Sequence, residues 1–238
     1  MPTTSALDSF RKAYLGATDS YMAWRDGYPV DESLAQVLTP AEHLEDVSEL
    51  LKAVRAGNFD GRAVQGLGYL HCTEALPLLH QLVRQEEFIS HAFQAIAYID
   101  PRALDQSLVL KLLTSKINWR NPLHMLIGLL DPRRRFVDIL VGLRTSFTLA
   151  DLEPRLLSRI LALLAHKDYL VRYHALYALR QLYNTPINEQ GDKPTVYDGL
   201  SRDVLFPLIR TSKTPESYRR AQDAFLASLP LEARISLH

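Results

Sequence analysis

A short apolar segment recurs along this sequence, and the recurrence restricts the folds that the chain can adopt. Residues 63–70 align without gaps with residues 92–99, and looser copies begin at Pro122, Ala175 and Ala221. The starting residues are 29, 30, 53 and 46 positions apart, so the later units carry insertions. A unit of roughly 30 residues cannot bury its apolar face alone, because burial requires stacked neighbours. The repetition therefore predicts a stack of similar units.

The repeated units have the pattern of helices. Apolar residues follow helical spacing almost from end to end, and no stretch shows the sustained alternation of a strand. A capping residue followed by proline marks helix starts, as in Thr39-Pro40 and Thr214-Pro215. Glu42 is placed to close a capping box with Thr39. The sequence predicts an all-α chain.

Small and bulky residues alternate within the repeat in a way that predicts close helix packing. The small positions are Ala63, Gly66, Ala92, Ala95, Ala175 and Ala178. The bulky positions that follow them are Leu67, Ile96, Leu126, Leu179 and Phe225. A helix with this pattern is buried on one face against its neighbours. We interpret Gly66 and Gly68 as packing residues and not as a phosphate-binding loop, because they lie within a helical pattern.

One segment carries a family signature. Asp168, Val171, Arg172, Ala175 and Leu179 have the spacing of a HEAT repeat, in which an aspartate turn precedes Val-Arg and spaced Ala and Leu. Residues 60–230 resemble this family, and their first units resemble its shorter, bilin-lyase-like variant. The resemblance implies an all-α, right-handed α-solenoid of stacked helix pairs.

The repeat does not extend to the beginning of the chain, so we expect two regions. Residues 1–58 are expected to form an N-terminal helical cap, and residues 59–238 a HEAT-like repeat solenoid. The polar segment 184–199 is expected to be a loop insertion, either functional or merely mobile.

Composition and motifs argue against catalysis, cofactors and metals. Lys+Arg and Asp+Glu both number 27, and nucleic-acid binders usually carry a basic excess. Cys72 is the single cysteine and is expected to be buried. None of the eight histidines precedes a glutamate or pairs at helical metal-ligand spacing. The start of the chain lacks a signal-peptide pattern and the apolar runs are too short to span a membrane, so we expect a cytoplasmic protein.

The repeat also predicts a binding surface. In the HEAT family the second helix of each pair lines the concave side, so the polar positions of our repeat should form ladders there. These positions hold Gln65, Tyr69, Gln94, Tyr98, His124, Tyr177 and Asp223. Nearby lies an Arg/Tyr-rich patch of Arg172, Tyr173, Arg180 and Tyr183. Two alternatives are a plain solvated face and, for Arg172, a structural brace of the adjacent turn.

These observations favour a non-catalytic protein-binding module that captures a partner on its concave face. A bacterial immunity protein that neutralises a toxin is one form of it, and the arginine-rich, lysine-poor balance hints at a GC-rich genome. The alternative is a HEAT-like alkylpurine DNA glycosylase, for which Trp24, Trp119 and Asp223 would supply the site. A bilin-lyase-like role is a third, fainter possibility. The oligomeric state stays open.

A run of three arginines, at residues 133–135, opens an expected helix. Positive charge at a helix N-terminus opposes the helix dipole. Neighbouring carboxylates, Asp131 among them, or an acidic partner must therefore compensate it.

Overall fold

The computed structural model describes residues 5–16, 33–57, 59–115, 132–184, 205–211 and 213–230. Over these ranges every element is a helix and none is a strand, which confirms the predicted all-α class. The chain divides into two compact units, Met1–Leu104 and Asp105–His238. The solenoid arrangement and the division at residue 58 stay predictions.

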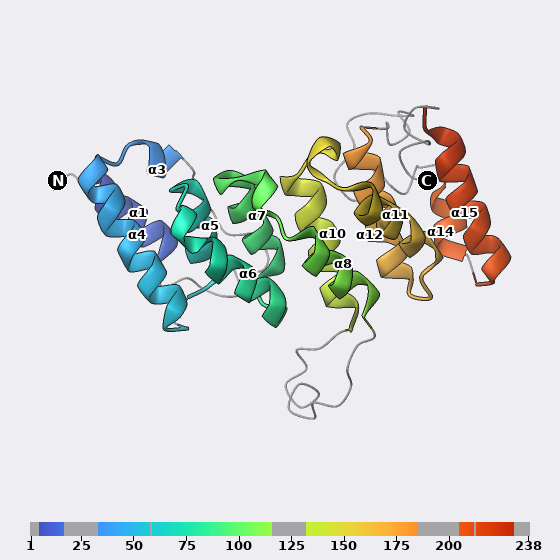
Figure 1. Cartoon of the computed structure of the whole chain (residues 1–238), viewed down its shortest axis with the longest axis horizontal. Helices are drawn as coiled ribbons and strands as arrows, with labels where there is room; N and C mark the ends of the chain where they lie inside the picture. The colour runs from blue at the N-terminus through green and yellow to red at the C-terminus, as the bar shows by residue number, and fades with distance from the viewer. Residues whose placement is uncertain are drawn as a thin grey trace, which may run out of the picture. The chain divides into compact units, whose positions relative to one another are not determined.

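The first unit is built around helix α5 (Gly61–Tyr69), which packs against α4 (Pro40–Arg55) and α7 (Ile89–Ile99) (Figure 1). Its other elements are α1 (Ala6–Tyr14), α3 (Ser33–Gln36), η1 (Thr73–Ala75), α6 (Leu76–Gln85) and η2 (Pro101–Ala103). The buried side chains of α1 and α4 include Phe10, Tyr14 and Leu50. Much of the predicted cap region therefore shares one core with the first repeat helix.

Close approach of α5 and α7 depends on the small residues that the repeat predicted. A Cβ atom added to Gly68 would lie 2.5 Å from the Cα of Ala95, closer than two carbon atoms can approach. A Cβ atom on Gly66 would lie 3.0 Å from side-chain atoms of Tyr14 and Leu50. Ala92 and Ala95 have no exposed surface. The interpretation of the two glycines as packing residues is confirmed.

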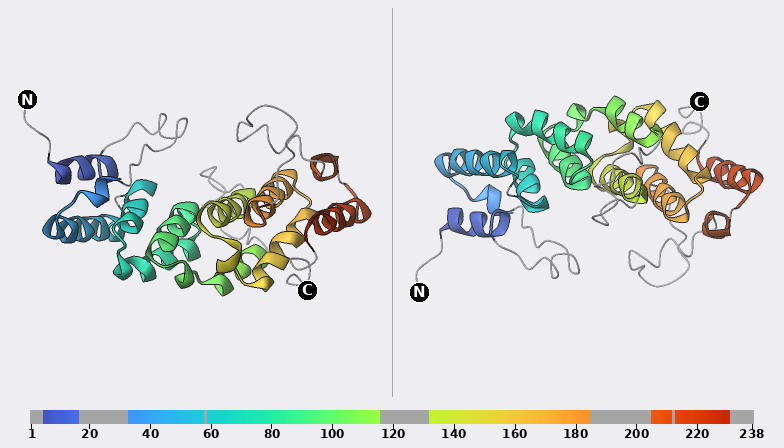
Figure 2. Two further views of the ribbon diagram at one scale, coloured as in Figure 1. Left: turned by 90° about the horizontal axis from the view of Figure 1, so that it is seen from above. Right: turned by 90° about the horizontal axis from the view of Figure 1, so that it is seen from below.

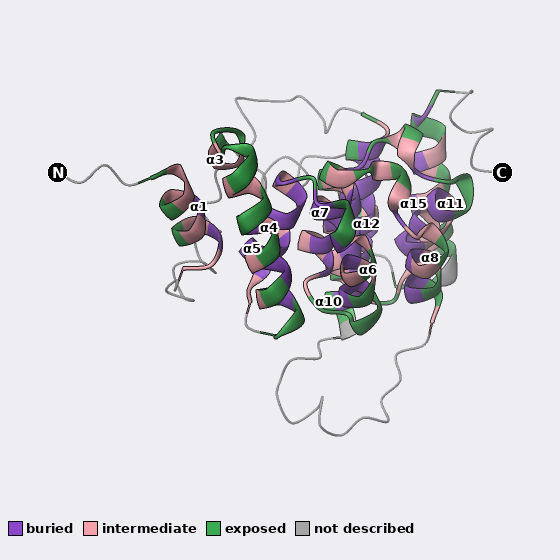
Figure 3. Cartoon of the chain, turned by 60° about the vertical axis from the view of Figure 1, so that its left-hand side comes forward, coloured by how far each residue is buried: buried purple, intermediate pink, exposed green. Residues whose placement is uncertain are grey.

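The second unit is organised around helix α12 (Tyr169–Leu182), which packs against α10 (Pro132–Ser146), α11 (Pro154–Ala162) and α14 (Phe206–Thr211) (Figure 2). Its other elements are α8 (Gln106–Thr114), η3 (Leu149–Asp151), η4 (Leu163–Ala165) and α15 (Pro215–Ser228). Burial is concentrated on α5 in the first unit and on α12 in the second (Figure 3). The segment with the Asp168, Val171, Arg172 spacing thus begins the central helix of its unit.

Helix starts are stabilised by the caps that the sequence indicated. Thr39 accepts from the backbone N–H of Glu42, whose carboxylate accepts in turn from the backbone of Thr39. Thr214 forms the corresponding pair with Ser217. Each cap satisfies backbone N–H groups that a helix leaves without internal partners.

Candidate functional site

In the first unit, two predicted glutamines on neighbouring helices bind each other. The side-chain amide of Gln65 on α5 donates to Oε1 of Gln94 on α7 at 2.6 Å. The amide of Gln94 donates in turn to the hydroxyl of Tyr69 at 3.2 Å. These side chains link α5 to α7, so much of their hydrogen-bonding capacity is used inside the unit.

The tyrosines of the first unit extend this cluster to the surface. The ring of Tyr69 lies 4.7 Å from that of Tyr98 and 6.1 Å from that of Tyr14, centroid to centroid, both edge to face. Tyr14 is buried, whereas Tyr98 is 38% exposed. The structure therefore brings four predicted residues together and leaves Tyr98 as the most exposed of them.

In the second unit, α12 presents a row of tyrosines. Tyr169, Tyr173 and Tyr177 are four residues apart, so they lie along one face of the helix. Neighbouring rings are 6.1 and 6.5 Å apart. Phe206 of α14 lies edge to face against the first two rings, at 6.4 and 6.3 Å. Tyr169 and Tyr173 are partly exposed.

An arginine from α10 closes the other end of this row. The guanidinium carbon of Arg144 lies 3.9 Å from the ring centroid of Tyr177, close enough for a cation–π interaction. Arg144 also donates to Nδ1 of His174 at 3.3 Å. Burial, together with this neighbouring positive charge, lowers the pKa of His174 to about 4. We call Arg144, Tyr169, Tyr173, Tyr177 and Phe206 the tyrosine strip.

Sequence analysis anticipated only part of the tyrosine strip. Tyr173 and Tyr177 were expected, but Tyr177 is only 9% exposed because it lies beneath Arg144. Tyr169, Phe206 and Arg144 were missed. The four-residue spacing of the tyrosines was a visible signal, whereas the contributions of α10 and α14 required knowledge of tertiary packing.

The two predicted arginines of α12 are buried and bind within the protein. Arg172 is 3% exposed and donates to the carbonyl oxygens of His166, Lys167 and Ile209. Arg180 is 5% exposed and donates to the hydroxyl of Ser228. Neither guanidinium therefore belongs to an exposed binding surface. For Arg172 the alternative of a structural brace describes its contacts.

The arginine run at the start of α10 is compensated inside the second unit. Arg133 lies 3.6 Å from the carboxylate of Asp168, and Arg134 lies 3.4 Å from that of Asp138. Arg135 donates to the carbonyl oxygen of Ser115. The expected compensation is thus provided by contacts within the protein. Asp131, which was also expected to contribute, lies outside the described residues.

The remaining predicted residues do not converge on a catalytic arrangement in the described part of the chain. Asp223 is exposed on α15, while His124, Trp24 and Trp119 lie outside the described residues, as do residues 185–199 of the expected loop. No group of three or more potential metal ligands occurs among the described side chains. Cys72 is buried, as expected, and burial raises its pKa.

Charge is distributed unequally between the units although the whole chain is neutral. Residues 1–104 contain 8 lysines and arginines and 14 aspartates and glutamates, a formal charge of −6. Residues 105–238 contain 19 and 13, a formal charge of +6. Neutrality of the whole chain therefore conceals a basic second unit.

Comparison of the chain with protein-family models, with curated proteins and with solved structures found no match in any of the three. Within the described residues, no helix is both long enough and apolar enough to cross a membrane.

Proposed function

We propose that this chain is a non-catalytic module that captures a partner protein through partly exposed aromatic side chains. The observation that carries the proposal is the tyrosine strip, in which three helices hold four aromatic rings and an arginine together. Tyrosine and arginine are enriched among residues that dominate the energy of protein interfaces.

The strip has the physical properties of a preorganised interface. Each tyrosine offers a large apolar ring and a polar hydroxyl, so it can contact a partner without leaving a polar group unsatisfied. The rings of Tyr169 and Tyr173 restrain each other through a tilted contact, and Phe206 restrains both through edge-to-face contacts. Side chains already held in place lose less conformational entropy on binding than mobile ones.

In the first unit, Tyr98 is the corresponding candidate contact. It is 38% exposed, and its ring packs edge to face against that of Tyr69. Our proposal includes the α-solenoid of HEAT-like repeats. It also includes a bacterial, cytoplasmic setting, in which neutralising a toxin would be a fitting role for such a module.

The test is complex formation with a defined protein. The full chain is co-expressed with the products of its flanking genes, and complexes are measured by size-exclusion chromatography with light scattering. Tyr173→Ala and Tyr98→Ala should each weaken a complex by about tenfold or more, as expected for contact aromatics at an interface. Tyr177 is a poor test residue because its ring is buried under Arg144.

A matched control is Tyr218→Ala, which removes a tyrosine of α15 near Arg172 and outside the strip. All variants should keep the helical circular dichroism of the parent chain. Unchanged affinity in both Tyr98→Ala and Tyr173→Ala would overturn the proposed surface.

One observation favours a second candidate, the alkylpurine DNA glycosylase. The formal charge of +6 over residues 105–238 would suit a phosphate backbone. Against it, the proposed acid Asp223 is exposed to solvent on α15. Release of alkylated bases from duplex DNA by the full chain, lost in Asp223→Asn, would favour this candidate instead.

A further inference from the structure

Among the described residues close to the tyrosine strip, Asp168 pairs with Arg133, and the other charged side chains are mainly cationic. Arg144 belongs to the strip itself. Arg210 is exposed one helical turn after Phe206 on α14, so both lie on one face of that helix. Lys167 is exposed two residues before Tyr169. Arg172 links the two segments that carry Lys167 and Arg210. Its guanidinium donates to the carbonyl of Lys167 and to that of Ile209, the residue before Arg210.

Among the described residues of the second unit, four of the seven carboxylates are bound within the unit. In its described part, lysine and arginine outnumber aspartate and glutamate by 14 to 7. Three of these carboxylates, on Asp105, Asp151 and Asp168, accept from backbone N–H groups at helix starts. Asp138 pairs with Arg134. The excess of cations among the described residues therefore favours a positive potential at this unit's surface.

We infer that the tyrosine strip docks an acidic protein surface, an inference that rests on the proposed function. The cations beside the strip would lie opposite carboxylates of the partner, while Tyr169, Tyr173 and Phe206 would meet its apolar groups. Leu170, which is 40% exposed and adjacent to Tyr169, adds apolar area.

The ring geometry favours a protein over a single-stranded nucleic acid. Stacking of bases requires accessible ring faces. Here the face of Tyr177 is covered by the guanidinium of Arg144 at 3.9 Å. The rings of Tyr169 and Tyr173 are in contact with each other and, edge to face, with Phe206. These contacts within the strip take up ring surface that stacked bases would need.

The test uses a random peptide library displayed on phage and selected against the immobilised full chain at about 0.15 M salt, where distant charges are largely screened. Selected peptides should be enriched in aspartate and glutamate relative to the input. Arg210→Glu and Lys167→Glu should each weaken their binding by about tenfold. Replacing each glutamate of a selected peptide by glutamine should weaken its binding to the parent chain by a similar factor.

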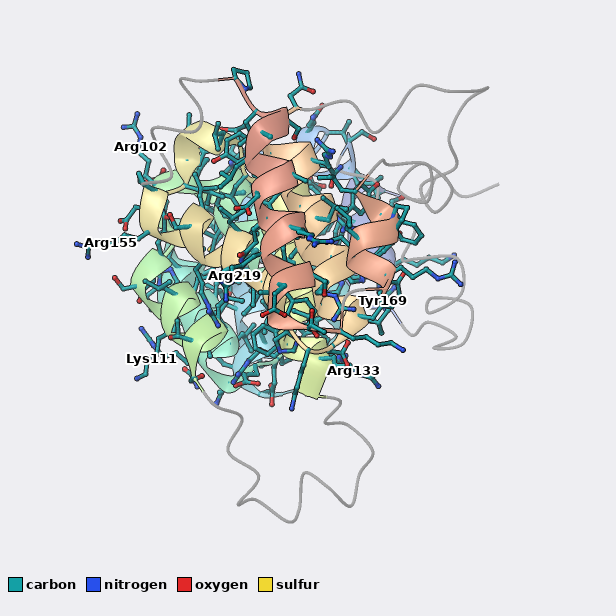
Figure 4. The ribbon with its side chains drawn as sticks, turned by 90° about the vertical axis from the view of Figure 1, so that its right-hand side faces the viewer. Arg102, Lys111, Arg133, Arg155, Tyr169 and Arg219 are labelled. Atoms are coloured by element: carbon teal, nitrogen blue, oxygen red, sulfur yellow. The ribbon has the colours of Figure 1, made fainter. Side chains whose placement is uncertain are left out.

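Matched controls come from cations on the other side of the same unit. Lys111 on α8 and Arg155 on α11 are exposed and point away from Tyr169 and Arg133, as Figure 4 shows. Lys111→Glu and Arg155→Glu make the same change of charge, so they should alter the affinity by no more than about twofold if long-range effects are small.

The outcomes separate this inference from the proposed function. If the selected peptides are neutral or basic and Tyr173→Ala abolishes their binding, the inference of an acidic partner is overturned and the proposed protein capture stands. If Tyr173→Ala leaves the affinity of the peptides unchanged, or if no peptide is selected, docking at the strip is overturned. If a single-stranded oligonucleotide binds more tightly than the peptides, the strip is assigned to nucleic acid. If the chain forms a dimer that Arg210→Glu abolishes, the strip is assigned to a second copy of the chain.

Discussion

At the scale of single residues, two arginines on packed helices of the second unit have different tasks. Arg172 is buried and satisfies three carbonyl oxygens at the ends of neighbouring segments. Arg144 is partly exposed and lies over an aromatic ring. The difference follows from their surroundings, because a buried guanidinium must use its donors within the protein.

His174 makes stability depend on pH. Its pKa falls from 6.5 to about 4 in the folded chain because of burial and Arg144. The unfolded chain therefore binds the proton more readily, so the free energy of unfolding should fall as the pH drops from about 6.5 to about 4. Burial also lowers the pKa of His91 and of His166, which act in the same direction.

Two variants isolate the contribution of His174. In His174→Gln the loss of stability on acidification should be smaller than in the parent chain, as measured by urea unfolding at several pH values. In Arg144→Gln the pKa of His174, followed by NMR of the imidazole, should rise. A His174 resonance that titrates near 6.5 in the parent chain would contradict the buried arrangement.

At the scale of elements, the α5–α7 contact is set by one glycine. Gly68→Ala gains about 1 kcal/mol in helix propensity but places a methyl group against the backbone of Ala95. We expect a net destabilisation of about 2 kcal/mol, since backbone cannot move as cheaply as a side chain. Thermal unfolding monitored by circular dichroism measures it.

Gly66→Ala is the internal comparison, because its methyl group meets side-chain atoms, Cδ1 of Leu50 and the ring of Tyr14, at 3.0 Å. These can shift by a few tenths of an ångström, so the cost should be clearly smaller than for Gly68→Ala. Equal costs in the two variants would show that helix separation is not what Gly68 determines.

The helices were largely predictable because their signals are local. Capping residues and 3.6-residue periodicity lie within single segments, as at Thr39 and Thr214. The glutamine pair Gln65–Gln94 was found because the repeat aligned two helices that do pack together. Arg144 and Phe206 were missed because their positions beside α12 follow from tertiary packing, which no periodicity in one segment encodes.

At the scale of the whole molecule, charge of opposite sign in the two units predicts behaviour in dilute salt. With formal charges of −6 and +6 and a pI near 7.1, copies of the chain should attract one another weakly near neutral pH. Static light scattering should give a negative second virial coefficient at about 10 mM salt that approaches zero at about 150 mM. A coefficient insensitive to salt would contradict electrostatic attraction as its cause.

Helix capping by aspartates in the second unit has a consequence for regulation. Asp105, Asp151 and Asp168 are fixed at backbone N–H groups, and two of the cations beside the strip, Arg144 and Arg210, are arginines. Arginine keeps its proton throughout the physiological range, and enzymes that acetylate lysine do not neutralise it. Among the three cations beside the strip, acetylation could therefore neutralise only Lys167, and control of the remaining charge would have to act through the abundance or the phosphorylation of whatever binds there.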